Sequence, residues 1–163
     1  IISLNSSDNC DTIYYMNVEE ILEMWKEDCK IDEMDLDLTS SQTPKLHSKY
    51  LELFTVAKLQ LKRLNLKIAT LKKDKWLYYT GKMTKEDMDD RGWDYDPYKG
   101  GIKPLKGDMD YYYDSDPDIQ ELVAKIEYQQ TVVDTLEEIM NNIRWRHSTI
   151  KNMIDWRRFT SGG

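Results

Sequence analysis

The sequence predicts an all-α fold built mainly from long helices with apolar seams. Residues 46–79 and 118–159 contain neither glycine nor proline, and apolar residues recur in both at alternating spacings of three and four. The stretch between them is rich in acids and aromatic rings and holds five of the seven glycines. The prediction is therefore two long helices separated by an acidic, aromatic loop.

Residues 1–45 are expected to hold a leader, a short helix and a linker. The motif NVEE at residues 17–20 has the form of a capping box, and apolar residues at helical spacing extend the helix to about Cys29. Residues 32–45 end in the polar run TSSQTP, which indicates a linker with Pro44 at the entry to the next helix. The first fifteen residues precede Met16 and are read as a leader, a truncated end or a misplaced start.

Residues 46–85 are expected to form a basic helix that ends near Gly81, a residue type common just after helix ends. Its apolar seam faces another helix. The seam consists of Tyr50, Phe54, Ala57, Leu61, Leu64, Ile68 and Leu71.

Residues 86–116 are expected to form the acidic, aromatic loop, with one helical turn and a short extended pair. Residues 117–163 follow as a C-terminal helix that begins at the motif SDPD. Its seam runs from Ile119 to Ile154 with two polar positions, Gln129 and His147. Such a helix is about 60 Å long, more than one small domain covers, so its far end is expected to pack on another chain. All four segments are expected to form one compact unit.

Composition excludes several classes of protein. No window approaches the roughly 20 apolar residues of a membrane-spanning helix. The two cysteines and two histidines form no metal-binding cluster, and the thiols suit a reducing compartment. No glycine-rich phosphate-binding loop is present, so neither an enzyme, a metal site nor a cofactor is expected.

Charge is unevenly distributed along the chain. Residues 50–85 hold nine basic and two acidic side chains, although the net charge of the chain is −7. This block is either an anion-binding surface or a helix face that complements an acidic partner. Cations interleaved with aromatic rings are typical of surfaces that bind single-stranded nucleic acid. Lys75 extends the apolar seam, a position that a purely structural helix normally avoids.

Two motifs carry a family resemblance. KKDKWLYYTGK (72–82) and RWRHSTIKNMIDWRRFTSGG (144–163) resemble the signature regions of the UvsY-type recombination mediator proteins of tailed phages. The opening NVEEILEMWKEDCKID is similar to their N-terminal helix, so the resemblance covers residues 16–163.

The resemblance implies a non-enzymatic protein that binds single-stranded DNA, weakens the coat of the phage single-strand binding protein and promotes loading of the UvsX-type recombinase. It implies action in recombination, repair and replication, in the cytoplasm of the infected bacterial host. The family's DNA-contacting basic pair corresponds to Lys73 and Lys75, ahead of Tyr78 and Tyr79. Together with the basic block, the expected DNA-binding residues are Lys58, Lys62, Arg63, Lys67, Lys72, Lys73, Lys75, Tyr78, Tyr79 and Lys82.

The resemblance also implies a homo-oligomeric ring, a hexamer or heptamer, held by the C-terminal region. The expected contacts are Ile143, Ile150, Met153, Ile154, Trp156 and Phe159. The acidic loop has three open roles, namely docking on a partner, shielding the basic block, or packing over the helices. The alternative function is a helical scaffold whose basic face docks on an acidic protein and never binds DNA.

Overall fold

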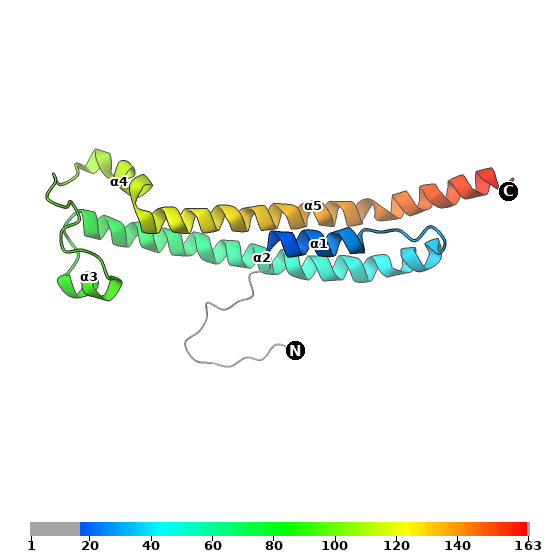
Figure 1. The fold of residues 1–163 in the computed structure, drawn as a ribbon, viewed down its shortest axis with the longest axis horizontal. Helices are drawn as coiled ribbons and strands as arrows, with labels where there is room; N and C mark the ends of the chain where they lie inside the picture. Colours follow the sequence, from blue (N-terminus) through cyan, green and yellow to red (C-terminus); the bar gives the residue numbers. More distant parts are fainter. Residues whose placement is uncertain (1–16, 163) are drawn as a thin grey trace, which may run out of the picture. The chain divides into compact units, whose positions relative to one another are not determined.

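A computed structural model describes residues 17–162, which form helices and connecting segments without a β-strand (Figure 1). The elements in chain order are α1 (Val18–Asp28), α2 (Leu36–Tyr79), α3 (Lys85–Arg91), the 3-10 helix η1 (Lys106–Asp108), α4 (Met109–Ser115) and α5 (Pro117–Thr160). The all-α prediction is confirmed. Within the described residues, no helix combines the length and the apolar character needed to cross a membrane.

The chain divides into two compact units. Unit 1 contains α1, the start of α2 up to residue 53, and α5 from residue 134 onward. Unit 2 contains residues 54–133, with the rest of α2, α3, η1, α4 and the start of α5. Because α2 and α5 each run through both units, the units do not follow the predicted segments. Residues 1–15, read from sequence as a leader, lie outside the described residues.

The helix α1 begins as its capping box predicts. The Asn17 side chain accepts a hydrogen bond from the Glu19 amide, and the Glu20 carboxylate accepts one from the Asn17 amide. In unit 1 the ring of Trp25 meets that of Tyr50 edge to face, with 5.4 Å between centroids. The Tyr50 hydroxyl donates to Asp28 over 3.0 Å, which joins the end of α1 to α2.

The predicted linker at 32–45 is largely helical, which corrects the sequence interpretation. Helix α2 starts at Leu36, and the Asp35 carboxylate accepts a hydrogen bond from the Leu38 amide at its first turn. Leu36 and Thr39 are buried, so packing outweighs the weak helix propensity of this polar run. Pro44 lies inside the helix rather than at its entry, where it removes one backbone hydrogen bond.

The ends of α2 and α5 in unit 2 are fixed by the residues that the sequence singled out. Gly81 has a φ of 71°, and the amides of Gly81 and Lys82 donate to the carbonyls of Tyr78 and Leu77. A left-handed residue with this pair of bonds is the usual glycine stop of a helix. At the start of α5 the Asp116 carboxylate accepts from the amides of Asp118 and Ile119.

The seams predicted for both long helices are confirmed as their inward faces. In α2 every seam residue is buried or half-buried, and in α5 only His147 is exposed. Gln129 is buried in unit 2, and its amide donates to the Ala57 carbonyl and the Gln60 side chain at 3.1 and 3.2 Å. The polar seam position is therefore satisfied between α2 and α5.

The predicted loop at 86–116 contains most of α3, the 3-10 helix η1 and α4, and the described chain has no extended pair there. Met88 and Met109 from this stretch are buried with Tyr78 and Tyr79 of α2. Trp93, Tyr112 and Tyr113 pack against the same cluster. We call residues 85–116 the acidic lobe. These three rings take the packing role, one of the three that the sequence left open, whereas Tyr95 and Tyr111 are exposed.

Candidate nucleic-acid interface

Four lysines of α2 form an exposed stripe in unit 2. Lys58, Lys62, Lys72 and Lys73 are exposed, and a rotation of about 100° per residue places them on one side of the helix. Within residues 17–162, Lys62, Lys72 and Lys73 have no acidic partner. We call these four residues the cation stripe. Unpaired, solvated cations in a row are suited to phosphates along a nucleic-acid backbone.

The only acid of α2 in unit 2 is kept off this stripe. Asp74 pairs with Arg91 of α3 at 3.0 Å, and the helical rotation directs it away from Lys72 and Lys73. The predicted DNA residues Arg63 and Lys67 are also exposed, but they lie about 130° and 170° around α2 from the middle of the stripe. The structure thus gathers some of the predicted cations and separates two of them.

Lys75 is buried, unlike the lysines of the cation stripe. A residue that contacts DNA is ordinarily exposed. Its side chain is 5% exposed and its ammonium group lies 2.8 Å from Asp116 and 2.6 Å from Asp118. The same ammonium stands 4.0 Å from the ring centroid of Trp93. A cation at a seam position is therefore explained by a buried ion pair between α2 and the start of α5.

Tyr78 and Tyr79 are also buried and bonded within the protein. The Tyr79 hydroxyl donates to Asp116 over 2.7 Å, and the Tyr78 hydroxyl donates to the Asp94 carbonyl over 2.9 Å. Burial raises the pKa of both phenols above its ordinary value, and for Tyr79 the bond to Asp116 raises it further. Neither ring offers a face to a base, so of the expected DNA residues these two and Lys75 have structural contacts instead.

The carboxyl group of Asp116 is the centre of this network. Burial raises its pKa, but hydrogen bonds from Lys75, Tyr79 and the Ile119 amide outweigh burial and hold the pKa below its usual value. A lowered pKa in the folded state means that the carboxylate stabilises the fold above the unfolded pKa of about 4, and less as the pH falls.

Asp116→Asn is expected to lower the free energy of unfolding at pH 7 by about 1–3 kcal/mol, because Lys75 loses a charged acceptor in a buried site. Asparagine caps helices as well as aspartate, so the start of α5 is retained. The variant should also lose less stability than the wild type between pH 5 and pH 3. Urea unfolding followed by tryptophan fluorescence at both pH values checks this, and equal losses would refute the role of Asp116.

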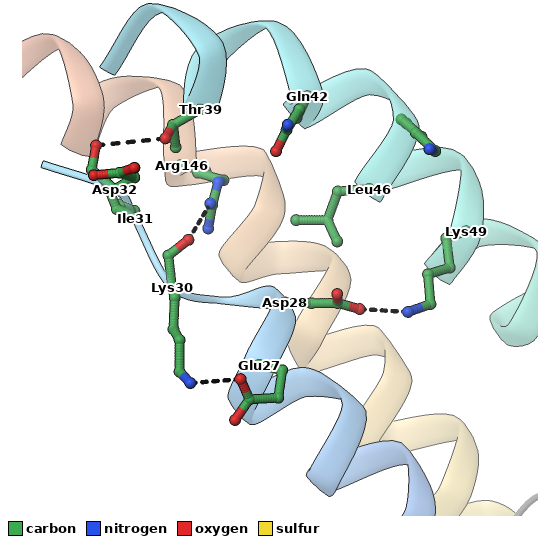
Figure 2. A pocket seen from close by; sticks show the side chains of 11 residues that line it. Glu27, Asp28, Lys30, Ile31, Asp32, Thr39, Gln42, Leu46, Lys49 and Arg146 are labelled. Atoms are coloured by element: carbon green, nitrogen blue, oxygen red, sulfur yellow. Dashed lines mark hydrogen bonds and ion pairs between the residues drawn. The ribbon is translucent and has the colours of Figure 1, made fainter. Parts of the chain in front are cut away.

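Unit 1 contains a pocket of about 630 Å³ between α1, α2 and α5 (Figure 2). The Arg146 guanidinium donates to the Cys29 and Lys30 carbonyls at 2.8 and 2.7 Å, so it caps the end of α1. Lys30 pairs with Glu27, and Lys49 pairs with Asp28. Because most of its charges are matched, the pocket fits a joint between helices better than an anion-binding site. Its lining is Glu27, Asp28, Lys30, Ile31, Asp32, Thr39, Gln42, Lys45, Leu46, Lys49 and Arg146.

The predicted oligomer contacts fall on two sides of α5. Ile143 and Ile150 are each 2% exposed and belong to the core of unit 1, which corrects their assignment to an interface between chains. Met153 and Ile154 are half-buried, whereas Trp156 and Phe159 are 66% and 79% exposed.

Sequence reasoning missed Trp145, whose exposed ring lies on the same side of α5 as Trp156 and Phe159. Trp145, Trp156 and Phe159 lie about 160–220° around the helix from Ile143, opposite the core. We call these three residues the outer aromatic face. Spacings of eleven and three residues could have revealed it, but the stronger inner seam masked the pattern.

Comparison with known proteins gives a family and a fold. The profile of the family described as "Recombination, repair and ssDNA binding protein UvsY" matches residues 24–163. The structure is similar to the bacteriophage T4 recombination mediator protein UvsY in lattice type II, with a TM-score of 0.76 and 22% identity over 90% of this chain and 99% of that chain. The lattice type I structure gives 0.73 and 21%, over 86% and 98%. No curated protein sequence matches.

Proposed function

Because the chain belongs to the UvsY family of recombination, repair and single-stranded-DNA-binding proteins, we propose that it is a recombination mediator that holds DNA on the cation stripe of α2. The observation that carries this assignment is the row of exposed lysines, of which Lys62, Lys72 and Lys73 have no acidic partner within residues 17–162. Each lysine supplies a phosphate contact without reading sequence.

The proposed role is to weaken the coat of the phage single-strand binding protein and to help a UvsX-type recombinase load on the freed strand. A mediator must bind DNA and then release it, which solvated lysines permit because each contact is weak and depends on salt. The chain is proposed to act without catalysis of its own, in the cytoplasm of the infected bacterial host. The scaffold alternative loses its basis, since the family description already includes binding of single-stranded DNA.

We further propose that the chain works as a ring, a hexamer or heptamer, joined by the C-terminal part of α5. The support is the outer aromatic face, because exposed rings clustered on one helix side are typical of interaction surfaces. Met153 stands at the border between this face and the core, where a neighbouring chain can cover it, whereas the half-buried Ile154 lies on the inner seam. A ring repeats the cation stripe in every subunit, so weak single contacts add up to useful avidity.

A loading assay tests the proposed function. Recombinase activity is followed on single-stranded DNA coated with the single-strand binding protein, with and without the chain. The chain should shorten the delay before filament growth, and the same chain with the four stripe lysines changed to glutamine should not. A delay unchanged by the wild-type chain would contradict the mediator role, even if the chain binds bare DNA.

A further inference from the structure

Trp76 is the one tryptophan of α2, and it stands next to the cation stripe. Its side chain is 36% exposed, whereas Tyr78 and Tyr79, two and three residues further on, are buried. Helical rotation places Trp76 on the same side of α2 as Lys72 and Lys73. The positive φ of Gly81 turns the chain back after the helix, and the Lys82 ammonium lies 4.3 Å from the Trp76 ring centroid.

The neighbouring aromatic residues that pack within unit 2 form hydrogen bonds to other protein groups. The indole N–H of Trp93 donates to Asp118 over 2.9 Å, and the Tyr98 hydroxyl donates to the Tyr79 carbonyl over 2.6 Å. The indole N–H of Trp76 has no protein acceptor within residues 17–162, and the ring is not part of the buried cluster around Tyr78 and Tyr79. Trp76 is thus a partly exposed ring of α2 that has Lys82 against it and the stripe lysines Lys72 and Lys73 on the same side of the helix.

We propose that Trp76 is a stacking platform for an unpaired base of single-stranded DNA, with Lys72 and Lys73 on the flanking phosphates and Lys82 at the edge of the ring. A flat ring stacks on any base, so the contact adds affinity without sequence preference. The proposal rests on the proposed function. Trp76 takes the stacking role that Tyr78 and Tyr79 cannot take because they are buried. In the absence of DNA the Lys82 ammonium lies over one face of the indole. A stacked base displaces it to the edge of the ring.

The test separates stacking from charge by using two ligands of equal length, a thymidine oligonucleotide and its abasic counterpart. Trp76→Leu should weaken binding of the thymidine strand by about 5- to 150-fold, the usual effect of one stacked base. Binding of the abasic strand and the salt dependence of both should stay as in the wild type. Trp76→Phe keeps a smaller ring, so its affinity for the thymidine strand should lie between those of the wild type and Trp76→Leu. Val56→Ala is the matched control, since Val56 is exposed on α2 but lies about 160° around the helix from Trp76.

Tryptophan emission gives a second measurement. Addition of the thymidine strand should quench the wild-type protein, and Trp76→Leu should lose the larger part of that quenching. If Trp76→Leu weakens binding of both ligands equally, or of neither, the stacking role is overturned. The same holds if the thymidine strand quenches Trp76→Leu as strongly as it quenches the wild type. If Lys72→Gln with Lys73→Gln also binds as the wild type does, the proposed surface itself fails, which is a distinct result from failure of stacking alone.

Discussion

Lys75→Ala is expected to lower the free energy of unfolding by about 3–5 kcal/mol, as removal of one partner from a buried ion pair does. The side chains of Lys75 and Asp116 are 5% and 1% exposed, so water cannot replace the lost ammonium without opening the site. Asp118 and the ring of Trp93 lose the same cation. The acidic lobe should therefore loosen from α2 at lower urea concentration than in the wild type.

Urea unfolding of wild type, Lys75→Ala and Lys73→Ala measures this effect. Lys73 is exposed and has no acidic partner within residues 17–162, so its variant should stay within about 0.5 kcal/mol of the wild type. Lys75→Ala combined with Asp116→Asn should recover part of the loss, since no buried charge then remains unpaired at that pair. Equal stability of the two single variants would contradict the buried role of Lys75.

Trp156→Ala with Phe159→Ala is expected to break the assembly into smaller species. The two rings lie 6.0 Å apart on the outer aromatic face and contribute little to the core of unit 1, so the subunit itself should stay folded. Loss of the ring-shaped oligomer should weaken binding of long single-stranded DNA by about 10²- to 10⁴-fold. Each subunit keeps its cation stripe, but the avidity of several linked stripes is lost.

Light scattering coupled to size exclusion gives the mass of each species. Ile150→Ala is the matched control, because Ile150 is buried in unit 1 and its truncation should cost about 2–5 kcal/mol of subunit stability. A double variant of unchanged mass would show that the outer aromatic face does not hold the chains together.

Local signals in the sequence were sufficient for much of the fold. The capping box at Asn17, the glycine stop at Gly81 and the acid-proline start of α5 each depend on neighbours within a few residues. The seams of α2 and α5 follow from spacing alone. The start of α2 was not predictable in this way, because Leu36 and Thr39 gain their stability from burial in unit 1 rather than from propensity.

The candidate site was predictable only in part, for a reason that Lys75 illustrates. Its position on the seam could be read from the sequence, but its partners Asp116 and Asp118 lie more than forty residues away. Sequence spacing cannot tell a buried ion pair from a phosphate contact, since both need a cation at that place. Trp76 was visible beside the lysines, but only the burial of Tyr78 and Tyr79 singles it out.

The salt dependence of binding to single-stranded DNA tests most directly whether the cation stripe holds the strand. Lys58, Lys62, Lys72 and Lys73 are changed together to glutamine and compared with a control of equal charge loss. The control changes Lys26, Lys30, Lys125 and Lys151, which pair with acids on their own or the adjoining helical turn. If each stripe lysine meets a phosphate, the log–log slope should fall by about 2.8 per subunit, and the control should keep the wild-type slope. Equal slopes for the two variants would contradict the assignment.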